Sequence, residues 1–161
     1  MITTKAIIYQ EQKDGGYKGV EVNLDGYPEE VGYIIHHKYQ EPTKVQSFID
    51  NHYCIASLGV LDEVLENVDV LDPRRNEACM INGQKFAKYT IVSMVRSYYT
   101  ANNVQAIING EITEHDEENI DRELEHPSYS YYQTLNGEWF IIDHTRKNNC
   151  VAKKLSDVIV E

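Results

Sequence analysis

The sequence feature that most constrains the fold is the stretch over residues 20–59, where strand, turn and helix signals follow one another without a gap. At its start, Val20 and Val22 alternate with Glu21 and Asn23. Such alternation is typical of a strand with one face buried and the other in water. The pattern therefore predicts a half-buried strand that leads directly into a helical segment.

A turn and a helix follow this strand. Asp25 and Gly26 favour a turn, because glycine accepts a positive φ and aspartate bonds its own downstream backbone. Pro28 suits the first helical position, where an N–H has no intrahelical partner in any case. The helix is expected to end before Pro42, since the residue preceding a proline is disfavoured in the α region. Its apolar side chains share one face, which places all of them in the core: Tyr27, Val31, Ile34, Ile35 and Tyr39.

Two more helices are predicted, one within this stretch and one that begins at its end. The first begins at Pro42, and its i, i+3, i+4 and i+7 positions hold Val45, Phe48, Ile49 and His52. Ser57 is a candidate N-cap for the second. This second helix repeats the same spacing with Leu61, Val64, Leu65 and Val68.

Hairpin signals occur at three places outside the helices. The predicted hairpins span residues 5–24, 78–86 and 129–143. Two of them contain an Asn-Gly dipeptide, at 82–83 and 136–137, which is the strongest short-range hairpin signal.

The remaining segments give weaker signals. Segment 89–100 is rich in β-branched and aromatic residues and is expected to be a strand, although a buried helix beginning near Lys85 fits the same pattern. Segment 104–108 is expected to be another strand, and 67–77 a polar connection. The tail, 151–161, fits either a closing strand or a short helix.

Together these elements predict an α+β fold in one domain, residues 1–161. An antiparallel sheet of hairpins would carry two or three short helices on one face. No internal repeat or second domain is expected.

Composition limits the class of protein. The formal net charge is −11, which disfavours direct binding to nucleic-acid phosphates. The charge serves either solubility or a surface that competes with nucleic acid for a basic partner. No apolar run is long enough to span a membrane, and the first ten residues do not look like a signal peptide. An odd number of cysteines, three, favours free thiols in a reducing cytoplasm over a disulfide framework.

The strongest charge run covers residues 111–125. It is either a solvated loop or helix face, or a patch that meets a basic partner. The acidic candidates for partner binding are Glu114, Asp116, Glu117, Glu118 and Asp121. In the last hairpin, Tyr129 and Tyr131 share one face of a strand and Tyr132 takes the other. One face is expected to be core and the other a binding surface, for which Tyr129 and Tyr131 are the candidates.

No motif of a phosphate loop, nucleophile elbow or zinc cluster is present, and no metal or cofactor is expected. Asp25 is the most interesting polar residue, since it ends a strand at the entry to a helix. It is either a cap for the helix opened by Pro28, which we favour, or a functional residue. Tyr27 beside it is a candidate ligand contact, although its spacing favours the core.

The chain resembles a family of small phage and prophage proteins. The resemblance rests on Asp25, Gly26, Tyr27, Pro28, Gly32, Ser57, Leu58 and Gly59, and on the late turn leading to Trp139. That family has a strand, an Asp-Gly-Tyr-Pro turn, two helices and a Ser-Leu-Gly segment. Leu24 departs from the pattern, since the family often has an aromatic residue there. The resemblance covers about sixty residues and the hairpin, and it implies a phage-associated origin.

The sequence is consistent with three hypotheses of function, which belong to different classes. The first is a non-enzymatic inhibitor of host antiviral defence, similar to an anti-CRISPR protein, that occludes a protein complex with a basic surface. The second is a sponge for a nucleotide second messenger, for which the basic candidates are Arg74, Arg75, Arg96, Arg146 and Lys147. The third is a small hydrolase that uses Asp25 and a histidine. The sequence leaves open whether the protein forms a homo-oligomer.

Overall fold

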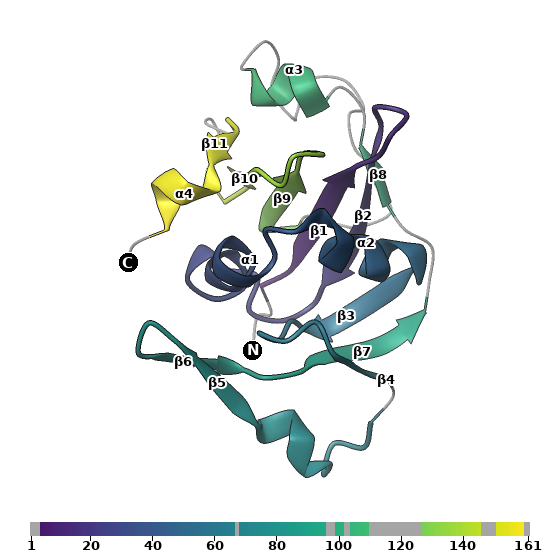
Figure 1. Ribbon diagram of the computed structural model, residues 1–161, viewed down its shortest axis with the longest axis vertical. Coiled ribbons are helices and arrows are strands. Elements are labelled where there is room, and N and C mark those ends of the chain that lie inside the picture. Colours follow the sequence, from purple (N-terminus) through teal and green to yellow (C-terminus); the bar gives the residue numbers. More distant parts are fainter. Residues whose placement is uncertain are drawn as a thin grey trace.

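A mixed β-sheet forms the centre of the molecule, with helices on both of its faces (Figure 1). The computed structural model describes residues 4–66, 68–95, 99–101, 104–109, 127–145 and 151–159. In these ranges, the strands of the large sheet are β1 (Ala6–Glu11), β2 (Tyr17–Val22), β3 (Tyr53–Ser57), β4 (Val64–Glu66), β7 (Thr90–Val95), β8 (Tyr99–Ala101), β9 (Tyr129–Gln133), β10 (Trp139–Asp143) and β11 (Lys153–Lys154). Strands β5 (Ala78–Ile81) and β6 (Gln84–Ala87) form a separate hairpin.

The helical elements are short. They are a π-helical turn (Pro28–Gly32), α1 (Tyr33–Lys38), α2 (Pro42–Asp50), a 3₁₀ turn (Pro73–Asn76), α3 (Val104–Ile108) and α4 (Leu155–Val158). No helix in the ranges above is both long and apolar enough to cross a membrane.

The strand order shows that the sheet is mixed. It runs β11-β10-β9-β1-β2-β3-β7-β4, with β8 paired to β2 beside this path. The β1–β2 and β9–β10 pairs are antiparallel, whereas β1–β9, β2–β3 and β4–β7 are parallel. The chain passes from β2 through α1 and α2 to β3, and such a helical crossover makes parallel neighbours. The α+β class is therefore confirmed, and the expected antiparallel sheet of hairpins also contains parallel strand pairs.

The three predicted hairpins and the helices beginning at Pro28 and Pro42 are present. Segment 89–100 contains β7 and β8, so the strand prediction holds for its described residues. In the described part of the tail, both expected elements occur, β11 and then α4.

Two predictions of secondary structure are wrong. The described residues of segment 57–68 do not form a helix: Ser57 ends β3 opposite Ile91, and Leu65 pairs with Ile91 in β4. Pairing with β7 on both sides overrides the helical spacing of the apolar residues. Segment 104–108 is a helix, α3, because Val104 and Ile108 are four residues apart and contact the same apolar cluster.

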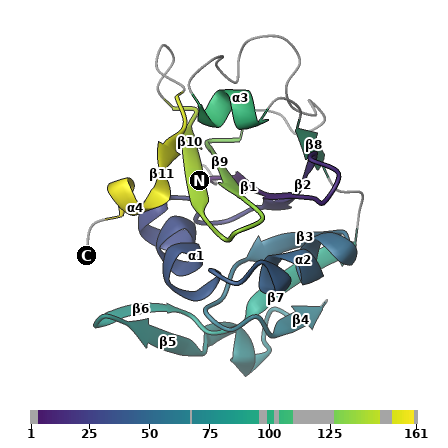
Figure 2. The ribbon, with the colours of Figure 1, turned by 45° about the horizontal axis from the view of Figure 1, so that its top comes forward.

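Two apolar clusters lie on opposite faces of the sheet. Ala6 and Ile8 of β1 belong to the cluster under α1 and α2, whereas Ile7 and Tyr9 belong to the cluster that includes Val104 of α3. Figure 2 shows α3 on one side of β1 and β2, with α1 and α2 on the other. The two helices of the first half therefore lie on one face, as predicted, whereas α3, in a segment expected to be a strand, covers the other face.

The covering of both faces also changes the environment of β2. Glu21 is only 3 % exposed, so the predicted wet face of this strand is buried. Its carboxylate accepts a hydrogen bond from the Cys54 thiol at 3.1 Å. Ile7, its cross-strand partner, belongs to the cluster on the α3 side.

A buried polar network attaches the turn between α1 and α2 to the sheet. Gln10 Nε2 donates to the Pro42 carbonyl at 2.7 Å and to Gln133 Oε1 at 2.8 Å. The Tyr39 carbonyl accepts from Gln133 Nε2 at 2.9 Å and from Trp139 Nε1 at 3.0 Å. Carbonyls at the end of a helix have lost their intrahelical partners. Side chains from β9 and β10 supply these donors at Tyr39, and Gln10 of β1 donates to the first residue of α2.

This network leads to a first prediction. Gln133→Met keeps the shape of the side chain but removes its donor to Tyr39 and its acceptor for Gln10. The free energy of unfolding should fall by about 1–3 kcal/mol, because buried polar groups lose their partners. Urea unfolding measures the change. Gln84→Met, at an exposed position of β6, is the control and should change stability by less than about 0.5 kcal/mol. Equal effects of the two substitutions would contradict the role assigned to the network.

A second prediction compares the two Asn-Gly turns. Gly137 and Gly83 have φ angles of +90° and +81°. A Cβ at Gly137 would collide with the Gln40 carbonyl oxygen, whereas one at Gly83 would meet nothing within 4 Å. Gly83→Ala should therefore cost about 1–2 kcal/mol for the left-handed backbone alone. Gly137→Ala should cost a further 1–3 kcal/mol, roughly the penalty of overpacking. Thermal and urea unfolding of both variants tests this difference, which would vanish if the β9–β10 turn did not lie against Gln40.

Candidate functional site

A cavity of about 290 Å³ lies beside Asp25. It is open to solvent and is lined by the π-helical turn and α1, by the end of β3, and by the β5–β6 hairpin with the segment that leads into it. Its apolar wall consists of Val31, Ile34, Leu58 and Phe86. The cavity thus brings Asp25 next to Ser57 and Leu58, which are thirty residues further along the chain.

Asp25 shapes the turn through its backbone. Its φ is +57°, and its carbonyl accepts a hydrogen bond from Val31 N–H at 3.2 Å. No side-chain hydrogen bond caps the helical turn, so the prediction that the Asp25 carboxylate is the cap is wrong. In this turn Asp25, and not Gly26, has the left-handed backbone conformation. Glycine is needed at position 26 for a different reason, because a Cβ there would press against Ala6 at the start of β1. The Asp25 carboxylate lines the cavity and is exposed.

Glu30 is the second carboxylate at the cavity. Partial burial raises the pKa of Glu30 above its ordinary value, and the nearby charges of Asp25 and Glu29 raise that pKa further. The helical turn holds these like charges close together. A cation placed in the cavity would relieve their repulsion.

Charges of both signs occur on the opposite wall. Glu77 and Lys85 line it together with Arg75, whose guanidinium donates to the Val68 carbonyl at 3.0 Å. Glu77 also forms an ion pair with Lys88 at 3.4 Å. The carboxylates and the apolar wall suit a long cationic side chain, whose alkyl part can lie on apolar surface while its charged end meets a carboxylate. Among the described residues that line the cavity there is no histidine, so it does not supply the Asp–His pair of the hydrolase hypothesis.

Tyr27 does not lie in the core. It is 42 % exposed, so its predicted place on the buried helical face is wrong. The backbone at Tyr27 is still extended, with φ −60° and ψ 151°, and therefore does not follow the helical spacing. Its ring contacts that of Tyr129, with 6.4 Å between the centroids. These two tyrosines form a small, partly exposed aromatic pair.

Tyr131 is buried, contrary to its expected place on a binding surface. It has no exposed area, and its hydroxyl donates to the Gly26 carbonyl at 2.6 Å. Burial raises the pKa of Tyr131 well above its ordinary value. Tyr132, on the other face of β9, is also fully buried and stacks on Tyr9 at 5.0 Å. Because helices cover both faces of the central sheet, only Tyr129 of these three can reach a partner.

Several predicted site residues lie outside the described residues. These are the acidic candidates Glu114, Asp116, Glu117, Glu118 and Asp121, and the basic candidates Arg96, Arg146 and Lys147. Their proposed contacts stay predictions. Within the described ranges, no cluster of three or more histidine, cysteine, aspartate or glutamate side chains is arranged to hold a metal ion.

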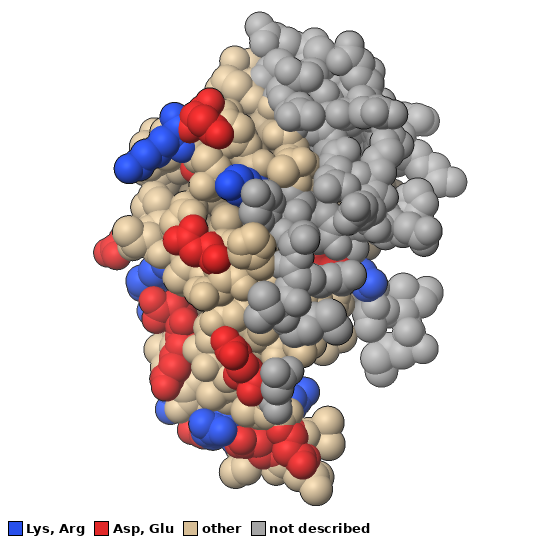
Figure 3. Space-filling model, turned by 90° about the vertical axis from the view of Figure 1, so that its right-hand side faces the viewer, with Lys and Arg blue, Asp and Glu red and all other residues tan. Residues whose placement is uncertain are grey.

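The structure reveals an acidic end of the molecule that sequence analysis does not single out. Exposed carboxylates occur along the chain from the end of β3 to the start of β5; they are Asp62, Glu63, Glu66, Asp69 and Glu77. Figure 3 shows acidic side chains gathered at its lower end, which Figure 1 shows to be formed by the connection between β4 and β5. A count of charged residues could have indicated this acidic end from the sequence, since segment 61–77 holds six acidic and two basic residues. The apolar residues among them instead suggested an amphipathic helix.

Comparison with protein-family models, curated proteins and solved structures finds no match to this chain.

The Glu30 environment leads to a third prediction. Because its folded pKa is raised, ionised Glu30 opposes folding at neutral pH. Glu30→Gln should therefore raise the free energy of unfolding at pH 7 by ~0.5 kcal/mol, a modest value because solvent screens a partly exposed group. The gain should shrink as the pH falls through the raised pKa, since native Glu30 is then protonated and neutral too. Urea unfolding between pH 4 and pH 7 measures it, with the exposed Glu41→Gln as the control. A gain that does not depend on pH would contradict this account.

Proposed function

We propose that this protein is a non-enzymatic binding protein that covers a basic surface on a partner protein complex. The observation that carries the proposal is the acidic end, where exposed carboxylates of segment 61–77 adjoin the cavity at Asp25. Residues 75–77 belong to both features, so a single partner surface can meet them together. The net charge of −11 would draw a basic surface from a distance and orient its approach.

The cavity supplies a specific contact within this acidic surface. A lysine or arginine side chain of the partner would place its charged end at Asp25 and Glu30 and its alkyl part against Phe86 and Ile34.

The resemblance to phage and prophage proteins supports a narrower form of the proposal. In this form the protein is an accessory inhibitor of host antiviral defence and acts in the bacterial cytoplasm. Its carboxylates would take the place of nucleic-acid phosphates on the basic surface of a defence complex. The acidic segment 111–125 and the half-buried Tyr129 would extend the same kind of contact.

The described arginines favour this function over a nucleotide sponge. Arg74 is held by Asp72 in an ion pair at 2.7 Å, and Arg75 donates to a backbone carbonyl. Both guanidinium groups thus make contacts within the protein. Nearby acidic side chains, Asp69 and Glu77, would also repel a phosphate.

A fourth prediction tests the acidic end by charge reversal. Protein captured from bacterial lysate is identified, purified and titrated against the double variant Asp62→Lys/Glu63→Lys. Binding should weaken at least tenfold, and the salt dependence of binding should decrease, because attractive charges become repulsive. The matched control, Glu41→Lys/Asp50→Lys, makes the same change of net charge at exposed positions of α2 and the residue before it.

The outcomes separate the parts of the proposal. Equal binding by both double variants and the unaltered protein would remove the acidic end from the interface. The triple variant Glu117→Lys/Glu118→Lys/Asp121→Lys tests segment 111–125 in the same titration. If neither Asp62→Lys/Glu63→Lys nor the triple variant weakened binding, the proposed function would be wrong.

A further inference from the structure

Two aliphatic residues stand at the acidic end with almost no cover. Val70 is 75 % exposed and Leu71 is 87 % exposed. Single apolar residues on a surface are common and need no explanation. Val70 and Leu71 differ from such single residues because they are adjacent and lie in a loop held by hydrogen bonds. The loop keeps both aliphatic side chains in contact with water, and neither gains free energy from burial.

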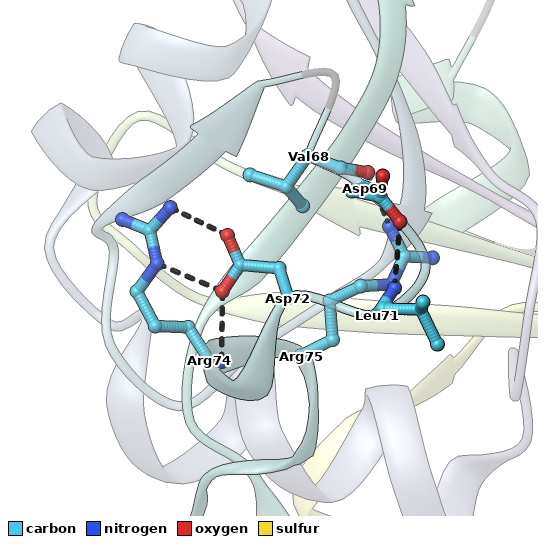
Figure 4. A network of polar contacts seen from close by, with 6 residues as sticks. All are labelled: Val68, Asp69, Leu71, Asp72, Arg74 and Arg75. Carbon is cyan, nitrogen blue, oxygen red and sulfur yellow. Dashed lines mark hydrogen bonds and ion pairs between the residues drawn. The ribbon is translucent and has the colours of Figure 1, made fainter.

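The loop that carries them is held by side chains that cap its backbone (Figure 4). Asp69 accepts from the Leu71 N–H at 2.9 Å, and the Asp72 N–H donates to the Asp69 carbonyl at 3.0 Å. Asp72 accepts from the Arg74 N–H at 2.9 Å and pairs with its guanidinium at 2.7 Å. Arg74 in turn holds the pKa of Asp72 well below its usual range, at about 2. The Leu71 side chain takes no part in these contacts.

Arg75 closes the loop from the other side, since its guanidinium donates to the Val68 carbonyl at 3.0 Å. The backbone on both sides of Val70 and Leu71 is therefore tied down before any partner arrives. A preorganised apolar contact loses little conformational freedom on binding, which favours affinity.

The charges around Val70 and Leu71 indicate the kind of surface that a partner would need. The flanking exposed carboxylates are those of Asp69, Glu66 and Glu77, while Arg74 is neutralised by Asp72. An apolar contact surrounded by negative charge fits an apolar pocket surrounded by positive charge. An anionic membrane surface would repel it. A second copy of this chain, with the same charge of −11, would repel it too.

We propose that Val70 and Leu71 form an anchor, which inserts into an apolar pocket bordered by lysine or arginine side chains on a partner protein. This inference rests on the proposed function and names the contact through which the acidic end is seated. The carboxylates orient the partner, and the anchor supplies the apolar burial that slows its dissociation.

The test uses the full-length protein with a photo-reactive p-benzoylphenylalanine in place of Val70. The control places the same residue at Leu135, which is 52 % exposed on the β9–β10 turn. After irradiation in bacterial lysate, the protein that is crosslinked at position 70 and not at position 135 is identified and purified. Its affinity is then measured for the unaltered protein, Leu71→Ser, Leu135→Ser and the charge-reversal variant Asp62→Lys/Glu63→Lys. Thermal unfolding checks that all variants are folded.

The anchor predicts at least tenfold weaker binding for Leu71→Ser and less than a twofold change for Leu135→Ser. Weaker binding after charge reversal but not after Leu71→Ser would overturn the anchor and leave the proposed function standing. If neither Leu71→Ser nor the charge reversal weakened binding, the anchor would be overturned and the acidic end would be removed from the interface. The anchor is also overturned by the absence of a crosslink specific to position 70, or by a crosslink only to a second copy of the chain. The anchor would also be overturned if the protein sedimented with phosphatidylcholine–phosphatidylglycerol vesicles and Leu71→Ser abolished this sedimentation.

Discussion

The placement of the helices depends on two buried glutamine side chains, Gln10 and Gln133. An amide both donates and accepts, so one side chain can bridge a neighbouring strand and a helix end at once. Here the pair joins β1 to β9 and holds the carbonyls at the end of α1 and the start of α2. Water cannot replace these partners in a closed core, so removal of one leaves several groups unsatisfied. The network therefore fixes the layer of α1 and α2 on the sheet.

The same turn connects the helices to the acidic end. The Tyr39 carbonyl belongs to the network, while the Tyr39 hydroxyl shares its hydrogen between the Gly59 carbonyl at 2.7 Å and the Leu61 carbonyl at 3.2 Å. Gly59 N–H in turn donates to the buried Thr90 hydroxyl at 3.0 Å. The loop that leads into the acidic segment is thus attached to both the helical layer and the sheet. Both the cavity at Asp25 and the anchor are presented by well-supported backbone, which is the arrangement expected of a preorganised binding surface.

Local signals predicted the elements that local forces determine. Asn-Gly turns marked two hairpins, and the prolines at 28 and 42 marked two helical starts. The errors occurred where long-range contacts decide. The spacing of Leu61, Val64 and Leu65 fits a helix, yet pairing with β7 makes this segment a loop and a strand. Alternation placed Tyr131 on a free face of β9, but α1 lies over that face and turns the tyrosine into a support for the Gly26 carbonyl.

By itself, the sequence determined the α+β class, the turns, the first two helices and the acidic charge, because each depends on neighbours within a few residues. Only the tertiary structure decided which carboxylates share a surface, that Asp25 lines a cavity instead of capping a helix, and that Val70 and Leu71 stay exposed while Tyr131 is buried. Those properties depend on burial and on contacts between segments far apart in the chain. A residue's type and spacing do not specify which segment will cover its side chain when helices pack on both faces of the sheet.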